Sequence, residues 1–418
     1  MRPRLAPFLA WPRPDGAQWR ADLVAGTTVA VVAIPQALAY AQLAGLPPYL
    51  GLYAAFVPTI VAALFGSSAQ LSTGPVALTA LLTSATLAPF AASGSAAYAS
   101  LAIALALGSG LLQCLAGVAR LGRLIERIPE SLMLGFVNAA ALVIALSQLP
   151  AMLGVRAASH ASFPEAVAAL VRGLPSAVLP TAAFGVVALV VLLVVRQAWP
   201  RAPGALAVSV VAIAASAWFG YERIGPVVGE LPAGLPVPAL PSIDAATVAM
   251  LLPAMALIAA VSFMEVTSSA RVIAARTGTS WNANQELLGQ GLAKLAAGVF
   301  QSFPVSGSFS RSALNLSAGA LTAWSSIVCA ALVAGALVFA ADALHHLPIA
   351  VLAALIVSAV VGLITPRELA SSWRASRWDM AIGATTLVVT LLSAPRIHYG
   401  LAAGLLVVAA RAVLTRSP

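Results

Sequence analysis

Two charged residues lie in stretches of the sequence that are otherwise apolar or only weakly polar. Glu265 stands within the apolar run 247–272, and Arg311 within the hydroxyl-rich segment "VSGSFSRSALN" at 305–315. A charge in an apolar environment costs about 3 kcal/mol or more unless it is paired or faces water. We therefore expect Arg311 to have a partner, and Glu265 is the natural one. The alternative is a fixed structural bridge between packed helices.

Two short segments could bind an anion through their backbone. Both open on small or hydroxylated residues, and Gly74 and Gly307 would let a ligand approach the main chain closely. The exposed N–H groups and the dipole at a helix start favour negative charge. The candidate groups are Thr73, Gly74, Pro75 and Val76 in the first segment, and Ser308, Phe309, Ser310 and Arg311 in the second.

A third group of donors comes from the segment "IPQALAY". Gln36 and Tyr40 are four residues apart, so in a helix they lie one above the other on the same face. Pro35 disturbs the helix directly before them. The pair predicts an amide and a phenol directed at an oxyanion, with interhelical hydrogen bonds as the alternative.

The composition indicates the class of fold that positions these groups. Of the 418 residues, 61% are hydrophobic and only 8% charged, with a mean hydropathy of +0.97. A water-soluble fold needs more charge, so we predict an all-α polytopic membrane protein. The net charge of +9 does not indicate nucleic-acid binding, because no Lys/Arg run is long. Cys114 and Cys329 are interpreted as packing residues, without metal-ligand spacing.

Apolar runs predict fourteen membrane spans, of which the third and tenth are too short to cross alone. They are 22–45, 50–66, 73–88, 97–118, 127–149, 180–197, 203–219, 247–272, 284–302, 308–318, 320–341, 346–363, 379–394 and 397–414. The segment 156–176 is predicted to be a loop. Paired short spans in two halves indicate inverted seven-span repeats and a secondary transporter.

The arginines predict the orientation of the chain. Of the 22 Lys and Arg residues, those predicted outside are Arg156, Arg172, Arg223 and Arg396, and those within spans are Lys294 and Arg311. The rest lie on the other side, so both termini are predicted to be cytoplasmic. The predicted parts are an N-terminal segment (1–21), the first repeat (22–220), an extracellular linker (221–246), the second repeat (247–414) and a C-terminal stub (415–418).

Some further polar residues receive a structural interpretation. Lys294 and Glu286 are predicted to be a pair at the inner boundary, with the lysine extending towards water. Asp342, His345 and His346 stand at the end of a span and are predicted to be interfacial.

Several of these segments together resemble one family of membrane proteins. They are "DLVAGTTVAVVAIPQALAYAQLAGLPPYLGLY", "STGPVALTALL", "MEVTSSARVIAARTG" and "NANQELLGQGLAKLAAGVFQSFPVSGSFSRSALN", and they resemble the sulfate permease (SulP) anion transporters. The resemblance implies the fold of the nucleobase transporters, with a core domain (spans 1–4 and 8–11) that moves as an elevator against a gate domain. It also implies a homodimer. Members commonly carry a C-terminal STAS domain, which this sequence does not show.

The same resemblance assigns roles to the residues already named. It implies a substrate between the starts of spans 3 and 10, with Gln36 and Tyr40 as ligands from span 1. Glu265 matches the acidic position that is tied to cation coupling. Together these features predict proton-coupled sulfate uptake across the inner (plasma) membrane, without a cofactor.

Other functions stay open at this point. Sodium-coupled bicarbonate uptake and chloride or dicarboxylate exchange would use the same groups. A membrane enzyme is disfavoured, because none of the four histidines lies in a span with a carboxylate at helical spacing. A scaffold that does not transport would leave the paired short spans unexplained.

Overall fold

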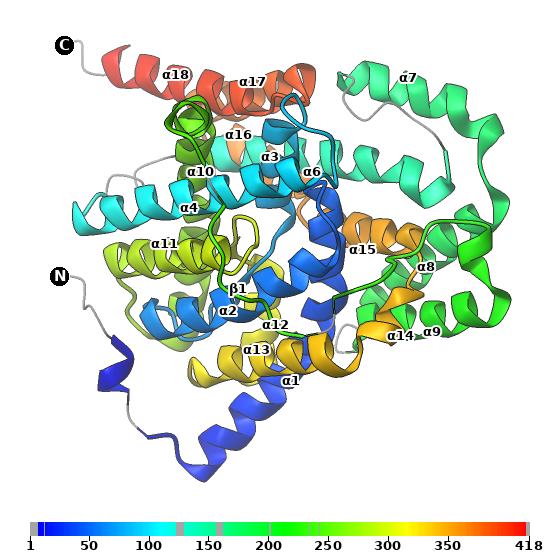
Figure 1. Cartoon of the computed structure of the whole chain (residues 1–418). Helices are drawn as coiled ribbons and strands as arrows, with labels where there is room; N and C mark the ends of the chain where they lie inside the picture. Colours follow the sequence, from blue (N-terminus) through cyan, green and yellow to red (C-terminus); the bar gives the residue numbers. More distant parts are fainter. Residues whose placement is uncertain are drawn as a thin grey trace.

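The computed structural model describes residues 7–11, 13–122, 129–155, 162–199, 202–232, 234–241 and 243–414. In this part of the chain the fold is helical apart from two strands of two residues each and two isolated bridges. Figure 1 shows the long helices stacked in layers, with the short strand β1 (Thr73–Gly74) among them. The residues of both short strands are buried.

The first half of the chain contains eight α-helices and one strand among the described residues. They are α1 (Gly16–Leu43), α2 (Tyr49–Phe65), β1 (Thr73–Gly74), α3 (Ala77–Leu87), α4 (Ala96–Val118), α6 (Glu130–Leu153), α7 (Phe163–Gly173), α8 (Leu179–Ala198) and α9 (Gly204–Phe219). Short 3-10 turns lie at η1 (Pro7–Ala10), η2 (Leu174–Ser176) and η3 (Tyr221–Arg223).

The second half has a similar order of elements. It contains α10 (Ala245–Thr277), α11 (Ala283–Val299), β2 (Ser306–Gly307), α12 (Phe309–Ser317), α13 (Trp324–Phe339), α14 (Ala341–His345), α15 (Ile349–Val361), α16 (Pro366–Ala375), α17 (Arg377–Ser393) and α18 (His398–Leu414). In both halves a very short strand precedes a short helix, β1 before α3 and β2 before α12.

Each predicted span coincides with a helix of the structure, which confirms the helical class. Six helical stretches among the described residues are long and apolar enough to cross a membrane, namely α1, α4, α6, α8, α10 and 349–374. Five shorter helices are also apolar. The number of crossings and the inverted repeats stay predictions. The stub 415–418 and Arg156 lie outside the described residues.

The prediction of a loop at 156–176 is wrong for its described part, because α7 occupies Phe163–Gly173. A capping box explains where this helix begins: the Ser162 side chain accepts from the third helical residue, and Glu165 accepts from the Ser162 backbone. No residue of α7 is buried. The apolar-run criterion missed α7 because the helix has only 11 residues, and its apolar run between Glu165 and Arg172 is too short to count as a span.

The helices pack into two groups. In the first, α4 packs on α10 and α11, α2 on α11 and α13, and α1 on α13. In the second, α6 packs on α8, α15 and α17, and α17 packs on α18. Figure 1 shows α4 and α11 side by side in the first group, and α17 beside α18 at the edge of the second. Helix α1 contacts both groups through α13 and α15.

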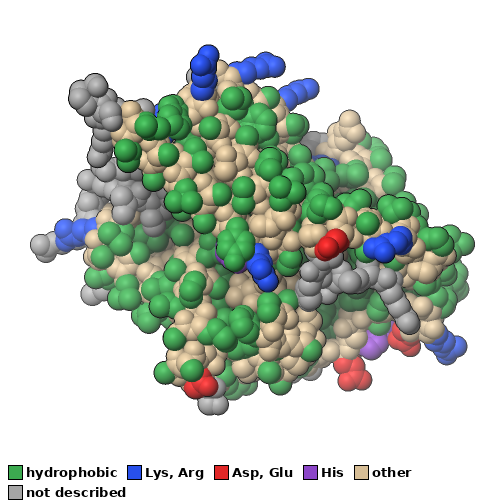
Figure 2. Space-filling view, turned by 90° about the horizontal axis from the view of Figure 1, so that it is seen from above, with side chains coloured by type: hydrophobic (Ala, Val, Ile, Leu, Met, Phe, Trp, Pro, Cys, Tyr) green, Lys and Arg blue, Asp and Glu red, His purple; other side chains and the backbone are tan. Residues whose placement is uncertain are grey.

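Small residues allow the closest helix contact in the first group. A Cβ added at Gly291 of α11 would lie 2.6 Å from Cys114 Sγ and 2.8 Å from the Gly110 carbonyl oxygen of α4. In membranes such small-residue contacts replace the hydrophobic effect as the source of helix association. The outer surface is apolar, with Leu179 80% and Phe339 89% exposed. Hydrophobic side chains cover much of the face in Figure 2.

We predict that Gly291→Ala destabilises the fold by about 1–3 kcal/mol, because the added methyl group meets backbone atoms that cannot move aside. The thermal midpoint of the purified protein in detergent measures this. Gly335→Ala in α13 is the matched control, since nothing lies within 4 Å of its added Cβ. An equal midpoint for the two variants would contradict the close α4–α11 contact.

Candidate functional site

The two short segments meet directly. Strands β1 and β2 pair antiparallel, with Thr73 opposite Gly307 and Gly74 opposite Ser306. The Ser308 N–H donates to the Ser72 carbonyl at 2.8 Å, which extends the pairing by one residue. These paired residues, 72–74 and 306–308, form the crossing of the two segments. Helices α3 and α12 each begin within three residues of the crossing. The first and second halves of the chain therefore place two helix starts together in the interior.

The two helix starts differ in how their N–H groups are satisfied. Val76 caps α3 in an extended conformation and forms no side-chain hydrogen bond to the helix. At α12 the Ser308 hydroxyl accepts from the Arg311 N–H at 3.3 Å. Unsatisfied N–H groups carry the positive end of the helix dipole. The start of α3 is therefore the better place for an anion to accept from the backbone.

Arg311 reaches across the crossing from α12 to the start of α3. Its side chain is buried, with 3% of its surface exposed. Nη1 donates to the Pro75 carbonyl at 2.9 Å and Nε to the Ser72 hydroxyl at 3.4 Å. Nη2 is buried without a partner, and a Cβ added at Gly74 would lie 3.1 Å from it. A side chain at Gly74 would press on this nitrogen, so the glycine lets the guanidinium lie against the main chain of the first segment.

The predicted ion pair between Arg311 and Glu265 is not formed in the structure. The ion pairs of the described residues join other side chains. The guanidinium instead uses the Pro75 carbonyl, an acceptor that costs less to bury than a carboxylate. Glu265 lies near Ser306 of β2, and both Lys294 and Arg311 act on its carboxyl group electrostatically. The glutamate is a neighbour of the arginine rather than its hydrogen-bond partner.

Buried charged atoms that lack hydrogen-bond partners lie together at the crossing. Among the described residues, the buried charged atoms that lack a hydrogen-bond partner are Arg311 Nη2 and Glu265 Oε2. Buried polar groups are nearly always paired in native proteins, and exceptions need an explanation. Since the two exceptions carry opposite charges and lie near one another, this region can take up both an anion and a cation.

Helix α1 carries the two residues predicted from its sequence, and Tyr40 lies near the charged groups of the crossing. Tyr40 is buried, and its phenol interacts electrostatically with Arg311 and Glu265. Gln36 Oε1 is buried without a partner. The two side chains lie one turn apart on α1, directly after Pro35. Neither side chain has a protein hydrogen bond among the described residues.

The side chains of Phe309 and Ser310 lie at the edge of the crossing. Both are exposed, Phe309 by 48%. The Ser310 hydroxyl lies 3.4 Å from that of Ser308. Of the predicted ligands in the second segment, Arg311 therefore points inward while Phe309 and Ser310 face outward.

Polar residues of α11 support the first strand. Gln290 Nε2 donates to the Thr73 hydroxyl at 2.8 Å and to Glu286 Oε1 at 3.2 Å. The Glu286 carboxylate also accepts from the N–H groups of Ser67 and Ser68 at 2.8 and 3.1 Å. Thr73 is thus a fixed part of the scaffold, with its hydroxyl already bound to the protein.

The prediction that Lys294 pairs with Glu286 at the membrane boundary is wrong. Lys294 has no exposed surface, and Nζ donates to Gln113 Oε1 at 2.9 Å. Gln113 Nε2 donates to the Ser262 hydroxyl at 2.9 Å, and Ser306 donates to the Ser262 carbonyl at 3.1 Å. A hydrogen-bonded chain therefore links the buried lysine on α11 to β2. Its sequence signal is the presence of Gln113 and Ser262 inside apolar runs.

The fold and this site define a class of protein. Buried groups of both charges meet at two helix starts inside a bundle of apolar helices, the architecture of a multi-pass membrane transporter. The model of the sulfate permease family matches residues 19–386. The chain belongs to this family, and its relatives are named as transporters.

Named relatives come from plants, bacteria and animals. The chain is 37% identical over 398 residues to the chloroplastic sulfate transporter 4.1 of Arabidopsis thaliana. It is 39% identical over 373 residues to a probable sulfate transporter of Mycobacterium tuberculosis. These alignments cover 93% and 89% of this chain but 57% and 66% of the relatives. The chain thus spans less than two thirds of the length of these relatives.

Solved structures share the fold. The murine Solute Carrier 26 family member A9 anion transporter in the inward-facing state matches with a TM-score of 0.90 over 98% of this chain and 71% of that chain, at 22% identity. The transmembrane domain of a cyanobacterium bicarbonate transporter, BicA, matches with a TM-score of 0.79 over 94% of this chain and 98% of that chain, at 24% identity.

We predict that Gln113→Leu destabilises the protein by about 2–3 kcal/mol, because the buried ammonium of Lys294 loses its hydrogen-bond acceptor. The thermal midpoint in detergent measures the loss. Gln197→Leu, at an exposed position of α8, is the control. The double variant Gln113→Leu/Lys294→Met removes the buried charge together with its acceptor. It should therefore recover most of the lost thermal midpoint. A double variant as unstable as the single one would contradict the pairing.

Proposed function

We propose that this protein is a secondary active transporter of small inorganic oxyanions that takes up sulfate together with protons. The observation that carries the proposal is the unpartnered Nη2 of Arg311, which is buried beside Gly74 where two helix starts meet. The names of the relatives as sulfate transporters support the choice of anion.

An oxyanion would satisfy the groups that the protein leaves open. A buried N–H group of a charged side chain without an acceptor costs about 1–3 kcal/mol or more. A sulfate oxygen beside Gly74 would accept from Arg311 Nη2, and a second oxygen would accept from the uncapped start of α3. Gly74 keeps the main chain beside Nη2 free of a side chain, and the anion would reach this buried nitrogen when the neighbouring side chains move apart.

Helix α1 would complete the site. The Tyr40 phenol can donate to an anion, because it has no protein acceptor among the described residues. Gln36 leaves its carbonyl oxygen unpaired, and rotation of its amide by half a turn would present the NH₂ group instead. Sulfate carries four oxygens, so donors from α1, α3 and α12 can bind it at the same time.

Glu265 would bind the coupling proton. Its Oε2 is buried without a donor, so protonation removes a charge that is poorly satisfied there. A dianion bound beside Arg311 makes a nearby carboxylate still less favourable. Anion and proton therefore support each other's binding, and this coupling is necessarily reciprocal. Because Arg311 stays bound to the Pro75 carbonyl, no ion pair has to break.

The two helix groups suggest how the site would be exposed to each side. We propose fourteen spans in two inverted repeats, with α3 and α12 carried by the first group. Elevator-like movement of that group against the second would then take the bound anion across the membrane. We also propose a homodimer in the inner membrane with both termini in the cytoplasm, as the arginine distribution predicts.

We predict that Arg311→Gln weakens sulfate binding roughly 10- to 100-fold, the effect of losing one hydrogen bond to a charged group. Binding of labelled sulfate to the purified chain measures this. Arg196→Gln is the matched control, because this exposed arginine also donates to a carbonyl, that of Ser358. Competition by bicarbonate, dicarboxylates and chloride in the same assay tests the identity of the anion.

Arg311→Lys separates the binding role from folding. It keeps the charge but lacks the forked geometry, so we expect binding intermediate between the unsubstituted protein and Arg311→Gln. Unchanged sulfate binding in a folded Arg311→Gln protein would remove the arginine from the site. Preferential competition by bicarbonate would overturn sulfate as the substrate.

We predict that Glu265→Gln makes sulfate uptake insensitive to a pH gradient. The amide imitates the protonated carboxyl group but cannot exchange a proton, so uptake becomes uncoupled. Uptake into proteoliposomes, with and without an inward proton gradient, measures this effect. Glu130→Gln, at an exposed position where α6 begins, is the control and should keep the dependence. A gradient response that persists in Glu265→Gln would exclude the glutamate from coupling.

A further inference from the structure

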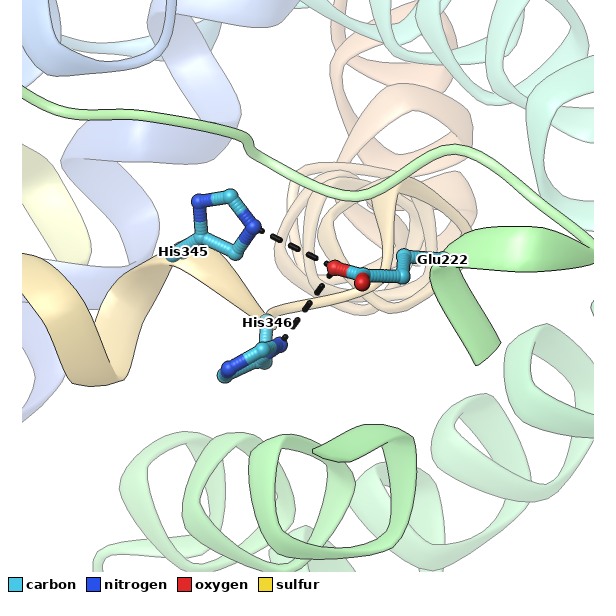
Figure 3. A group of neighbouring side chains, drawn as sticks. All are labelled: Glu222, His345 and His346. Atoms are coloured by element: carbon cyan, nitrogen blue, oxygen red, sulfur yellow. Dashed lines mark hydrogen bonds and ion pairs between the residues drawn. The ribbon is translucent and has the colours of Figure 1, made fainter. Parts of the chain in front are cut away.

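Three side chains that can bind metals converge at one place on the surface, away from the crossing. They are Glu222 of η3, His345 at the end of α14, and His346 directly after it (Figure 3). Their potential ligand atoms all lie within 4.8 Å of one another. We propose that they form a binding site for a divalent transition-metal ion, with Zn²⁺ as the preferred ion.

Two of the three separations come close to the edge of a coordination tetrahedron, and the third, between the two histidine nitrogens, is within 4.8 Å. Zn²⁺ binds nitrogen and oxygen at roughly 2.0–2.1 Å, so two ligand atoms of a tetrahedron lie about 3.4 Å apart. His345 Nε2 is 3.3 Å from Glu222 Oε2, and His346 Nδ1 is 3.8 Å from the same oxygen. A movement of the His346 ring by about half an ångström brings the second distance to the ideal edge.

The chemistry of the set selects the class of ion. Two imidazoles and one carboxylate are ligands that zinc and its neighbours prefer, whereas Mg²⁺ and Ca²⁺ require mostly oxygen. All three side chains are partly exposed, between 29% and 47%, so an ion can reach them from water. Three protein ligands leave a fourth position for a water molecule.

The backbone around the set is held in place before any ion binds. The Gly229 N–H donates to the His345 carbonyl at 3.2 Å, and the Val228 N–H donates to the Leu347 carbonyl at 2.9 Å. Next to Glu222, the buried Tyr221 donates to the Thr181 hydroxyl at 2.8 Å. The ligands therefore come from two segments that are already fastened together, which lowers the entropy cost of binding.

The three metal ligands lie near a connection between the two helix groups, so a bound ion would affect the relative movement of these groups. Turn η3 follows α9, which packs on α8 in the second helix group, and α14 lies in the connection between α13 of the first group and α15 of the second. An ion bound by Glu222 and both histidines would reinforce the backbone hydrogen bonds that already join the segment after η3 to this connection between the two groups. If transport needs these groups to move, as the proposed function holds, the bound metal slows it.

The binding test uses the purified whole chain without a polyhistidine tag, titrated with Zn²⁺ in competition with a metal-sensitive dye. We expect saturable binding, weakened at least about tenfold in His345→Ala, in His346→Ala and in Glu222→Gln. His398→Ala is the matched control and should bind normally, because its ring packs on Tyr399 instead. Co²⁺ provides a second measurement, since tetrahedral coordination gives an intense visible absorption.

Absence of saturable Zn²⁺ binding below about 100 μM, or equal binding by a His345→Ala/His346→Ala protein, would overturn the site. The effect on movement is read separately, from sulfate uptake into proteoliposomes with and without Zn²⁺. Zn²⁺ should slow uptake by the unsubstituted protein and not by the double variant. Equal slowing of both would overturn the link to transport. Failure of uptake under all conditions would count against the proposed function and leave the binding result intact.

Discussion

The hydrogen bond from the Arg311 guanidinium to the Pro75 carbonyl is the contact on which the interior of this protein depends. It joins a charge on α12 to the chain just before α3 begins, at a distance of 2.9 Å. The antiparallel pairing of β1 and β2 holds both ends in register, and Gly74 leaves the space through which the side chain reaches. Without this acceptor the buried charge would be too costly to keep.

The other buried charged groups differ from Arg311, because their charged atoms have hydrogen-bond partners within the protein. The Asp22 carboxylate accepts from the N–H groups of Leu321 and Thr322, Glu286 accepts from two N–H groups, and Lys294 donates to Gln113. These groups hold the scaffold, and each is satisfied. Only at the crossing do charged atoms of the described residues stay buried and unpartnered. Buried charged atoms without hydrogen-bond partners are typical of sites where a ligand or a proton supplies the missing partner.

Much of this architecture could be predicted from the sequence, because apolar runs and helix breaks have local signals. The short segments, the inward position of Arg311 and the placement of Tyr40 on the same site all follow from residue type and spacing. The partner of Arg311 does not, since any residue offers a carbonyl and none is marked in the sequence. The Lys294–Gln113 contact was missed for a related reason: it joins two helices whose packing the pattern does not specify.

The separation of Glu265 from Arg311 also determines what kind of coupling the site can support. An ion pair that had to break would place a large barrier in each cycle. In general, two charges that are not in contact, for example about 6–8 Å apart, interact by about 2–3 kcal/mol at an effective dielectric constant near 20. A coupling energy of that size changes an affinity roughly 30- to 150-fold, which is the usual range for two linked sites. In the proposed mechanism an electrostatic interaction of this size would link the anion to the proton, while Arg311 keeps its hydrogen bond to the Pro75 carbonyl.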